Sequence, residues 1–185
     1  MPGATAVYGW PYPILGDSPN GAAQMQSLAQ AVEGTVNGNN GRKTICVPQP
    51  GFTGPGTMTG GQTVTIGAYT ITDPGWAYHI RMAGQLAWQQ VNAAAIQTMG
   101  MHLSTQVDST TYGTNMLGDS FQGNLTASNG TTMTNTVPTQ NSTKITPGGY
   151  TGSHAVYLIA QAVGNTLSIL TTNSLSSWMI EILPV

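Results

Sequence analysis

Residues 76–89 read WAYHIRMAGQLAWQ, and this stretch decides the fold. Its large apolar side chains fall on one parity, namely Trp76, Tyr78, Ile80, Met82, Leu86 and Trp88. Alternation with a period of two over this length predicts a β-strand with one face in a core, or two strands separated by a kink at Gly84. The Asp73-Pro74-Gly75 sequence before it has the chemistry of a turn.

Further short strands are expected on both sides of this stretch. The candidate strands are residues 43–47, 62–72, 96–103, 153–163, 166–172 and 177–183. Gly164-Asn165 predicts a tight hairpin between two of them, and the Thr- and Asn-rich residues 104–149 predict short strands with long exposed loops. Many short strands with only one helix predict a mainly β fold, an antiparallel jelly-roll sandwich.

An extended arm and one short helix precede the predicted sandwich. The prolines in Tyr8-Gly9-Trp10-Pro11-Tyr12-Pro13 exclude a helix there, so the arm docks its aromatic residues either on its own domain or on another protein. Residues 21–33 form a candidate helix whose seam, Ala22, Met25, Ala29 and Val32, has heptad spacing. Such a short helix must pack on the following domain or on its own copies. Turn residues within 37–42 mark a linker, so the expected domains are 1–36 and 43–185.

The stretch Ala155-Val156-Tyr157-Leu158-Ile159-Ala160 is apolar on both parities. A strand of an antiparallel sandwich usually exposes one polar face, so either loops of the same chain or another subunit must cover the second face. We favour a subunit contact because the heptad seam and the low charge also indicate self-association. The sequence therefore predicts a homotrimer whose interface includes the helix seam together with Tyr157 and Ile159.

The charge and cysteine content exclude several classes of protein. Of 185 residues, only 5% are charged, with Lys+Arg 4 and Asp+Glu 6, against about 25% in an average soluble domain. No cationic field is present to bind nucleic acid. The single Cys46 excludes a disulfide framework and is expected to be buried and inert. The longest apolar run is far shorter than the ~20 residues of a membrane span, and residues 1–10 lack a secretory signal, so synthesis in the cytoplasm without membrane insertion is expected.

Residues that could carry chemistry are few and scattered. His79, His102 and His154 stand alone, and Asp108 and Asp119 lack the spacing of a calcium loop. No nucleophile elbow or phosphate-binding loop occurs, and an enzyme acting on glycan would need a carboxylate pair about 5–9.5 Å apart. We therefore expect no enzyme activity, no metal and no cofactor. The polar loops with Tyr112, Phe121 and Tyr150 are better suited to surface recognition, saccharide included.

Two regions of the chain resemble a known group of proteins. The arm Tyr8 to Pro13 followed by AAQMQSLAQAVE (22–33) is similar to the amino-terminal attachment segment of accessory virion proteins of tailed bacteriophages infecting actinobacteria. The sequence Asp73-Pro74-Gly75-Trp76 with its alternating strand, and the closing region from Ala155 to Val185, resemble the β-rich heads of that group. Those heads resemble trimeric jelly rolls of the C1q and tumour-necrosis-factor type. The resemblance covers both ends well and the Thr/Asn-rich middle poorly.

The resemblance implies a non-enzymatic structural protein on the virion exterior. Its implied anchor is the set Tyr8, Trp10, Pro11, Tyr12 and Pro13. The implied partners are its own copies, other virion proteins of tail or capsid, and a host cell-surface glycan. A minor tail or fibre protein that contributes to host attachment is the first interpretation. A capsid decoration protein or head fibre, docked by the same arm on the major capsid protein, remains the alternative.

Overall fold

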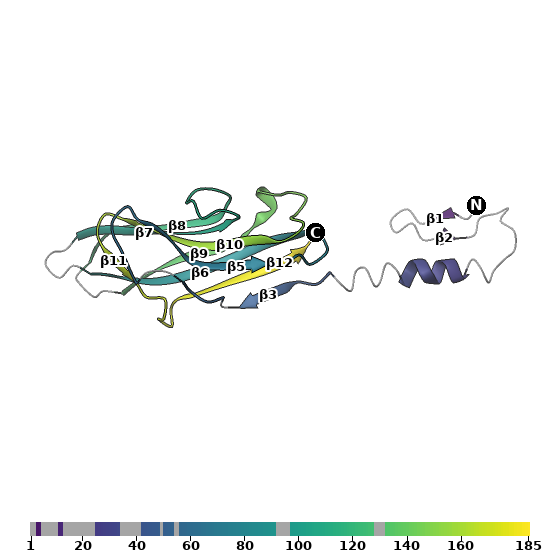
Figure 1. The fold of residues 1–185 in the computed structure, drawn as a ribbon, viewed down its shortest axis with the longest axis horizontal. Helices are drawn as coiled ribbons and strands as arrows, with labels where there is room; N and C mark the ends of the chain where they lie inside the picture. Colours follow the sequence, from purple (N-terminus) through teal and green to yellow (C-terminus); the bar gives the residue numbers. More distant parts are fainter. Residues whose placement is uncertain are drawn as a thin grey trace. The chain divides into compact units, whose positions relative to one another are not determined.

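The computed structural model describes residues 3–4, 11–12, 25–33, 42–48, 50–53, 56–91, 97–127 and 132–185. The chain divides into two compact units, Met1–Lys43 and Thr44–Val185, which appear with their elements in Figure 1. We call the second unit the head. Each unit is described by itself.

The described residues of the N-terminal unit include two short strands and a helix. Strand β1 (Gly3–Ala4) pairs antiparallel with β2 (Pro11–Tyr12), and residues 25–33 are helical. The extended backbone at Pro11 and Tyr12 agrees with the proline-rich sequence, and the helix lies within the predicted range. Tyr8, Trp10, Pro13 and Ala22 lie outside the described residues.

The head is built from antiparallel strands that run along its length (Figure 1). Its first sheet contains β5 (Thr63–Ile71), β10 (His154–Val163), β7 (Gln97–Val107) and β8 (Met116–Ala127) in that order. The second sheet contains β3 (Ile45–Pro48), β12 (Ser177–Pro184), β6 (Tyr78–Gln90), β11 (Leu167–Ile169) and β4 (Thr57–Met58), and β9 (Thr132–Asn141) also pairs with β6. A short 3-10 helix, Ser142–Lys144, follows β9.

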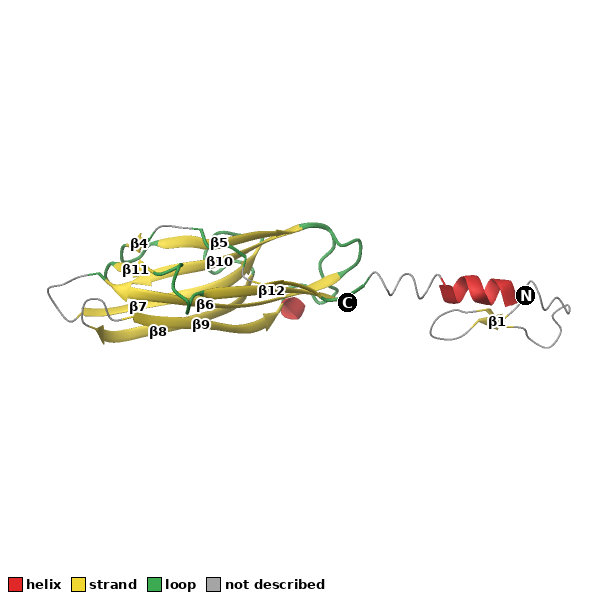
Figure 2. Ribbon diagram, turned by 90° about the horizontal axis from the view of Figure 1, so that it is seen from below, coloured by secondary structure: helices red, strands yellow, loops and turns green. Residues whose placement is uncertain are grey.

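The strand pairing is that of a jelly roll. The first strand of the head pairs with the last in β3–β12, and moving inward along the chain the pairs are β4–β11, β5–β10, β6–β9 and β7–β8. This nesting wraps one long antiparallel hairpin into two sheets, which confirms the predicted fold class. The edge strands β8 and β9 lie side by side where the sheets meet (Figure 2).

The core between the two sheets contains the alternating large apolar side chains of β6 that the sequence predicted to be buried. Tyr78, Ile80, Met82, Leu86 and Trp88 are fully buried, and β6 runs unbroken past Gly84, with a bulge in its pairing to β9 between Met82 and Gly84. The two-strand alternative is therefore wrong. The expected turn is also present, since Asp73 Oδ1 accepts a 2.8 Å bond from Gly75 N and Gly75 has a φ of 78°.

Two other sequence expectations need correction. Residues 167–169 form no hairpin with β10, because β11 pairs with β6 and β4 in the opposite sheet. Residues 104–149 contain β8 and β9 as strands of 12 and 10 residues in place of the short strands expected. Polar residues such as the exposed Thr132 and Thr136 and the buried Asn135 make this region resemble a loop in composition, whereas pairing with β7 and β6 holds β8 and β9 in the sheets.

Candidate functional site

A cluster of four side chains lies on the outer face of the first sheet. His102 of β7 and Phe121 of β8 are direct cross-strand partners, and their rings stack at 4.3 Å with an interplanar angle of 25°. Asp119 lies two residues before Phe121 and so projects from the same face. Its Oδ2 accepts a 2.9 Å hydrogen bond from the Tyr112 hydroxyl and lies 3.2 Å from His102 Nδ1. We call these residues the Phe121 cluster.

The loop of residues 108–115 supplies Tyr112 and folds over the same face. Both of its ends have left-handed backbone, with φ of 55° at Asp108 and 50° at Asn115. Beneath it, the fully buried Gln106 side chain contacts the loop backbone. With its amide oriented to satisfy both groups, its nitrogen donates to Thr111 O at 2.7 Å and to Thr114 O at 3.0 Å. The Tyr112 ring is thereby held against His102, at 5.4 Å between centroids.

A second histidine pair fixes the start of this loop. His154 Nδ1 lies 2.6 Å from Asp108 Oδ2, and Asp108 Oδ1 accepts a 3.0 Å bond from Ala155 N. The His154 ring also packs at 4.6 Å from the Tyr150 ring. Asp108 thus connects the loop to β10, and both oxygens of its carboxylate are engaged in contacts that stabilise the fold.

Burial raises the pKa of Tyr112 to about 12, and its hydrogen bond to Asp119 adds to the shift. Tyr78, whose hydroxyl donates to Gly152 O, also has a pKa raised by burial to about 12. Tyrosine side chains of the unfolded chain ionise near pH 10.0. The higher pKa of Tyr112 and Tyr78 in the folded state therefore stabilises the folded protein fully below that pH, and this stabilisation is lost as the pH rises towards 12.

The free energy of unfolding should therefore fall between pH 10.0 and about 12. The Tyr112→Phe variant has no phenol to ionise at this position, so its decline should be shallower than that of the wild type. Urea denaturation over this pH range measures the difference, and phenolate absorbance should show late-ionising tyrosines. A single ionisation step near pH 10.0 for every tyrosine would contradict this expectation.

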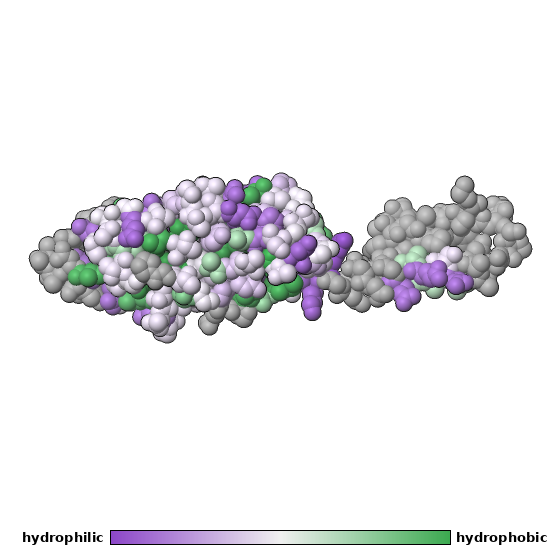
Figure 3. Space-filling model, viewed as in Figure 1, coloured by the Kyte–Doolittle hydropathy of each residue, from purple (hydrophilic) through white to green (hydrophobic). Residues whose placement is uncertain are grey.

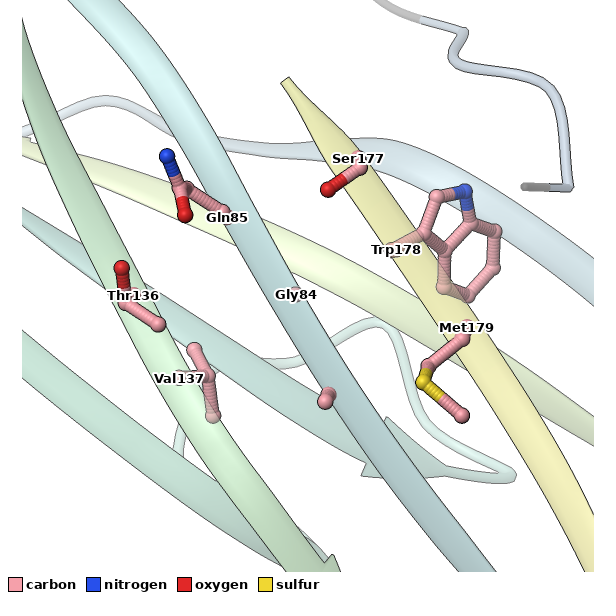
Figure 4. A pocket seen from close by; sticks show the side chains of 8 residues that line it. Gly84, Gln85, Thr136, Val137, Ser177, Trp178 and Met179 are labelled. Atoms are coloured by element: carbon pink, nitrogen blue, oxygen red, sulfur yellow. The ribbon is translucent and has the colours of Figure 1, made fainter. Parts of the chain in front are cut away.

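The opposite sheet has a shallow hollow on its outer face. It has a volume of about 380 Å³ and is lined mainly by small or apolar groups of β6, β9 and β12. Thr136 and Val137 flank it on one side and Ser177 and Met179 on the other, with Gly84 of β6 between them (Figure 4). Arg81 and Glu181 form an ion pair between β6 and β12 in the same sheet.

The residues predicted to lie in the trimer interface differ in how much of their side chain is exposed. On the helix, Met25 is 67% exposed, Ala29 is exposed and Val32 is partly buried. On β10, Tyr157 is partly buried, whereas Ile159 is 0% exposed although it lies outside the cluster that forms the core. One chain thus already covers Ile159, which has no surface left to bury against a second copy. The trimer itself stays a prediction.

The sequence missed how these residues combine. His102 and His154 were expected to stand alone, yet each lies beside a carboxylate. Asp119 and Phe121 have the i, i+2 spacing of one strand face, a signal hidden because residues 104–149 looked like loops. Cys46 is exposed and not buried, because β3 is an edge strand whose outward parity it occupies.

Other site types find no support in the described residues. Among them no group of three or more His, Cys, Asp or Glu side chains could hold a metal ion. No helix in the described ranges is long and apolar enough to cross a membrane. On the face seen in Figure 3 the head surface is mostly of intermediate hydropathy, with strongly hydrophilic side chains scattered across it.

No protein-family model and no curated protein matches the chain. Solved structures that match include the Gx strain of infectious bursal disease virus, at 12% identity and a TM-score of 0.43 over 77% of this chain and 32% of that chain. The VP2 subviral particle of the same virus matches at 10% identity and 0.41, over 77% and 32%. Its T=1 particles match at 10% and 0.42, over 77% and 31%. This chain spans about a third of the length of these proteins.

Proposed function

We propose that this chain is a non-enzymatic structural protein of a tailed-phage virion. In this proposal it is a homotrimer, anchored by its N-terminal arm, with a jelly-roll head that contributes to host-surface attachment as a minor tail or fibre protein. The observation that carries the proposal is the division into an N-terminal unit and a separate head. The N-terminal unit holds the residues that resemble a virion attachment segment, and the head has the jelly-roll pairing expected with it.

Self-association of the N-terminal unit is supported by its helix. Met25 and Ala29 leave apolar surface exposed, four residues apart and so on one helix face. A helix of this length gains little stability alone and needs a packing partner. Three copies packed along the seam Ala22, Met25, Ala29 and Val32 would supply one, with Tyr157 of the head as a further contact.

A role in recognition is supported by the composition of the head. With 5% charged residues in the chain, most of its contacts would be made by neutral polar and aromatic groups. Phe121 is 52% exposed, which places an aromatic surface where a ligand can reach it. Such groups suit hydroxyl-rich ligands, and the proposed partner on the host is a cell-surface glycan.

Deleting residues 1–17 should abolish incorporation into particles while leaving the head folded and trimeric. The reason is that the proposed anchor residues Tyr8, Trp10 and Tyr12 are lost while the helix seam is kept. Light scattering should give about three times the mass of one 19.2 kDa chain for the full-length protein, and a trimer again for the truncated one. Quantitative blotting of purified particles, grown without the native copy, measures occupancy.

A matched pair of variants separates the aromatic anchor from mere arm length. Replacing Tyr8, Trp10 and Tyr12 with serine should abolish incorporation, whereas Val7→Ser with Ile14→Ser should preserve it. Normal occupancy of particles by the truncated chain would refute the proposed anchor. A monomer mass for the full-length chain would refute the proposed trimer. Label over the capsid instead of the tail in micrographs of these particles would replace the tail assignment with capsid decoration.

A further inference from the structure

The Phe121 cluster has the features of a preformed binding surface. One side of the Phe121 ring packs on the His102 imidazole at 4.3 Å, and the side chain is still 52% exposed. Because the ring is stacked on one side, its exposed surface is the opposite side. The phenyl group therefore presents a flat apolar surface whose position is already fixed before any ligand arrives, which lowers the entropy cost of binding.

A hydrogen-bond acceptor stands beside this ring. Asp119 Oδ2 accepts a hydrogen bond from the Tyr112 hydroxyl at 2.9 Å and lies 3.2 Å from His102 Nδ1. The other carboxylate oxygen, Oδ1, makes neither of these contacts. The Tyr112 hydroxyl also lies 2.8 Å from His102 Nδ1, which closes a triangle of three side chains. Gln106 holds the loop that carries Tyr112. The orientation of the carboxylate is thus set by the protein, with one oxygen left for a ligand.

We infer that Phe121 and Asp119 form a subsite for the pyranose ring of a neutral sugar. The C–H face of the sugar would stack on the exposed side of Phe121, and a sugar hydroxyl would donate to Asp119 Oδ1. An aromatic ring beside a charge-assisted acceptor matches the alternation of C–H and O–H groups on a pyranose. The inference rests on the proposed attachment function for its biological setting, since the host surface supplies the glycan.

The charges around the cluster select a neutral sugar. The Lys and Arg residues of the chain are Arg42, Lys43, Arg81 and Lys144, and none of them belongs to β7, β8 or the loop 108–115. An acidic sugar would bring its carboxylate or phosphate towards Asp119 without a fixed cation to compensate. An ammonium ligand would need a cage of several aromatic walls, whereas the Tyr112 ring packs against His102 and leaves Phe121 as the exposed wall.

The test uses the full chain and sugars of known structure. Methyl glycosides of glucose, galactose, mannose, rhamnose and N-acetylglucosamine are the neutral probes, and glucuronic acid and N-acetylneuraminic acid are the acidic ones. Saturation-transfer NMR detects binding, and titration gives the dissociation constant. At least one neutral glycoside should bind, and Phe121→Ala should weaken that binding about tenfold or more because the stacking surface is lost. Phe121→Trp should restore it.

Controls keep the result specific to the cluster. Leu175→Ala removes a similarly exposed apolar side chain, 48% exposed and distant in sequence, and should leave sugar binding unchanged. Asp119→Ala should weaken binding as well. Thermal melts should show that Phe121→Ala stays folded, because its side chain is largely exposed. Binding of acidic sugars alone, equal binding by Phe121→Ala, or no binding of any neutral probe would overturn the inference.

Staining of host cells separates this inference from the proposed function. If wild-type protein and Phe121→Ala stain host cells equally, attachment stands and the Phe121 cluster is not its sugar site. If neither protein stains cells while neutral sugars bind in a Phe121-dependent way, the subsite stands and the attachment function fails. Staining by the wild type that Phe121→Ala loses and Phe121→Trp recovers supports both.

Discussion

Replacing Asn135 with leucine is expected to lower the free energy of unfolding by about 2–6 kcal/mol. Asn135 on β9 is almost fully buried, and its Oδ1 accepts a 2.7 Å bond from Trp88 Nε1 while its Nδ2 donates to Met101 O at 2.7 Å. The amide therefore connects β6 of one sheet to β7 of the other. Leucine would leave a buried indole N–H and a buried carbonyl without partners, and each such group costs about 1–3 kcal/mol.

Urea denaturation at fixed protein concentration measures this loss. Gln89→Ala is the matched control, because the Gln89 amide donates to Thr132 Oγ1 at 2.9 Å across the same strand pair but at the exposed surface; it should change stability by less than about 0.5 kcal/mol. Combining Asn135→Leu with Trp88→Phe should cost less than the sum of the two single changes, since the phenyl ring has no N–H to leave unpaired. A loss at Asn135 no greater than at Gln89 would show that the buried network contributes nothing.

Replacing Trp178 with alanine is expected to cost about 3–5 kcal/mol. The indole of Trp178 on β12 is 2% exposed, and its Nε1 donates to Pro50 O. It lies against Gly67 of β5 in the opposite sheet so closely that a Cβ at Gly67 would stand 2.8 Å from its Cζ2. Trp178 thus fills the space that the missing Gly67 side chain leaves between the sheets.

The contact predicts a specific coupling between the two positions. Gly67→Ala should cost about 1–3 kcal/mol in the wild type through overpacking, and clearly less in the Trp178→Ala background, where the ring it would strike is gone. Gly148→Ala is the control, because a Cβ there meets nothing within 4 Å, and its effect should stay within about 0.5 kcal/mol. Equal costs of Gly67→Ala in both backgrounds would contradict the proposed packing.

Local sequence was a good guide wherever a strand faced the core on one side. The parity of Trp76 to Trp88 predicted that the large apolar side chains of β6 are buried, because the strand repeat of two is fixed by the backbone alone. Trp76 itself precedes β6 and is only partly buried, and Ala87 of the other parity is also buried. Residues 104–149 were harder, since both β8 and β9 carry Thr, Asn and Gln at the sheet edges where the sandwich faces solvent. Their pairing depends on partners such as His102 and Trp88, which lie distant in sequence.

The amino-acid order by itself determined the mainly β class, a helix within residues 21–33 and the core parity of β6, because backbone periodicity and proline or glycine chemistry act over a few residues. Only the tertiary structure decided that β11 leaves β10 for the opposite sheet, that Ile159 is buried by its own chain, and that His102, Tyr112, Asp119 and Phe121 meet on one face. These outcomes depend on which strands become neighbours, and that choice reflects the packing of the whole core rather than any local pattern.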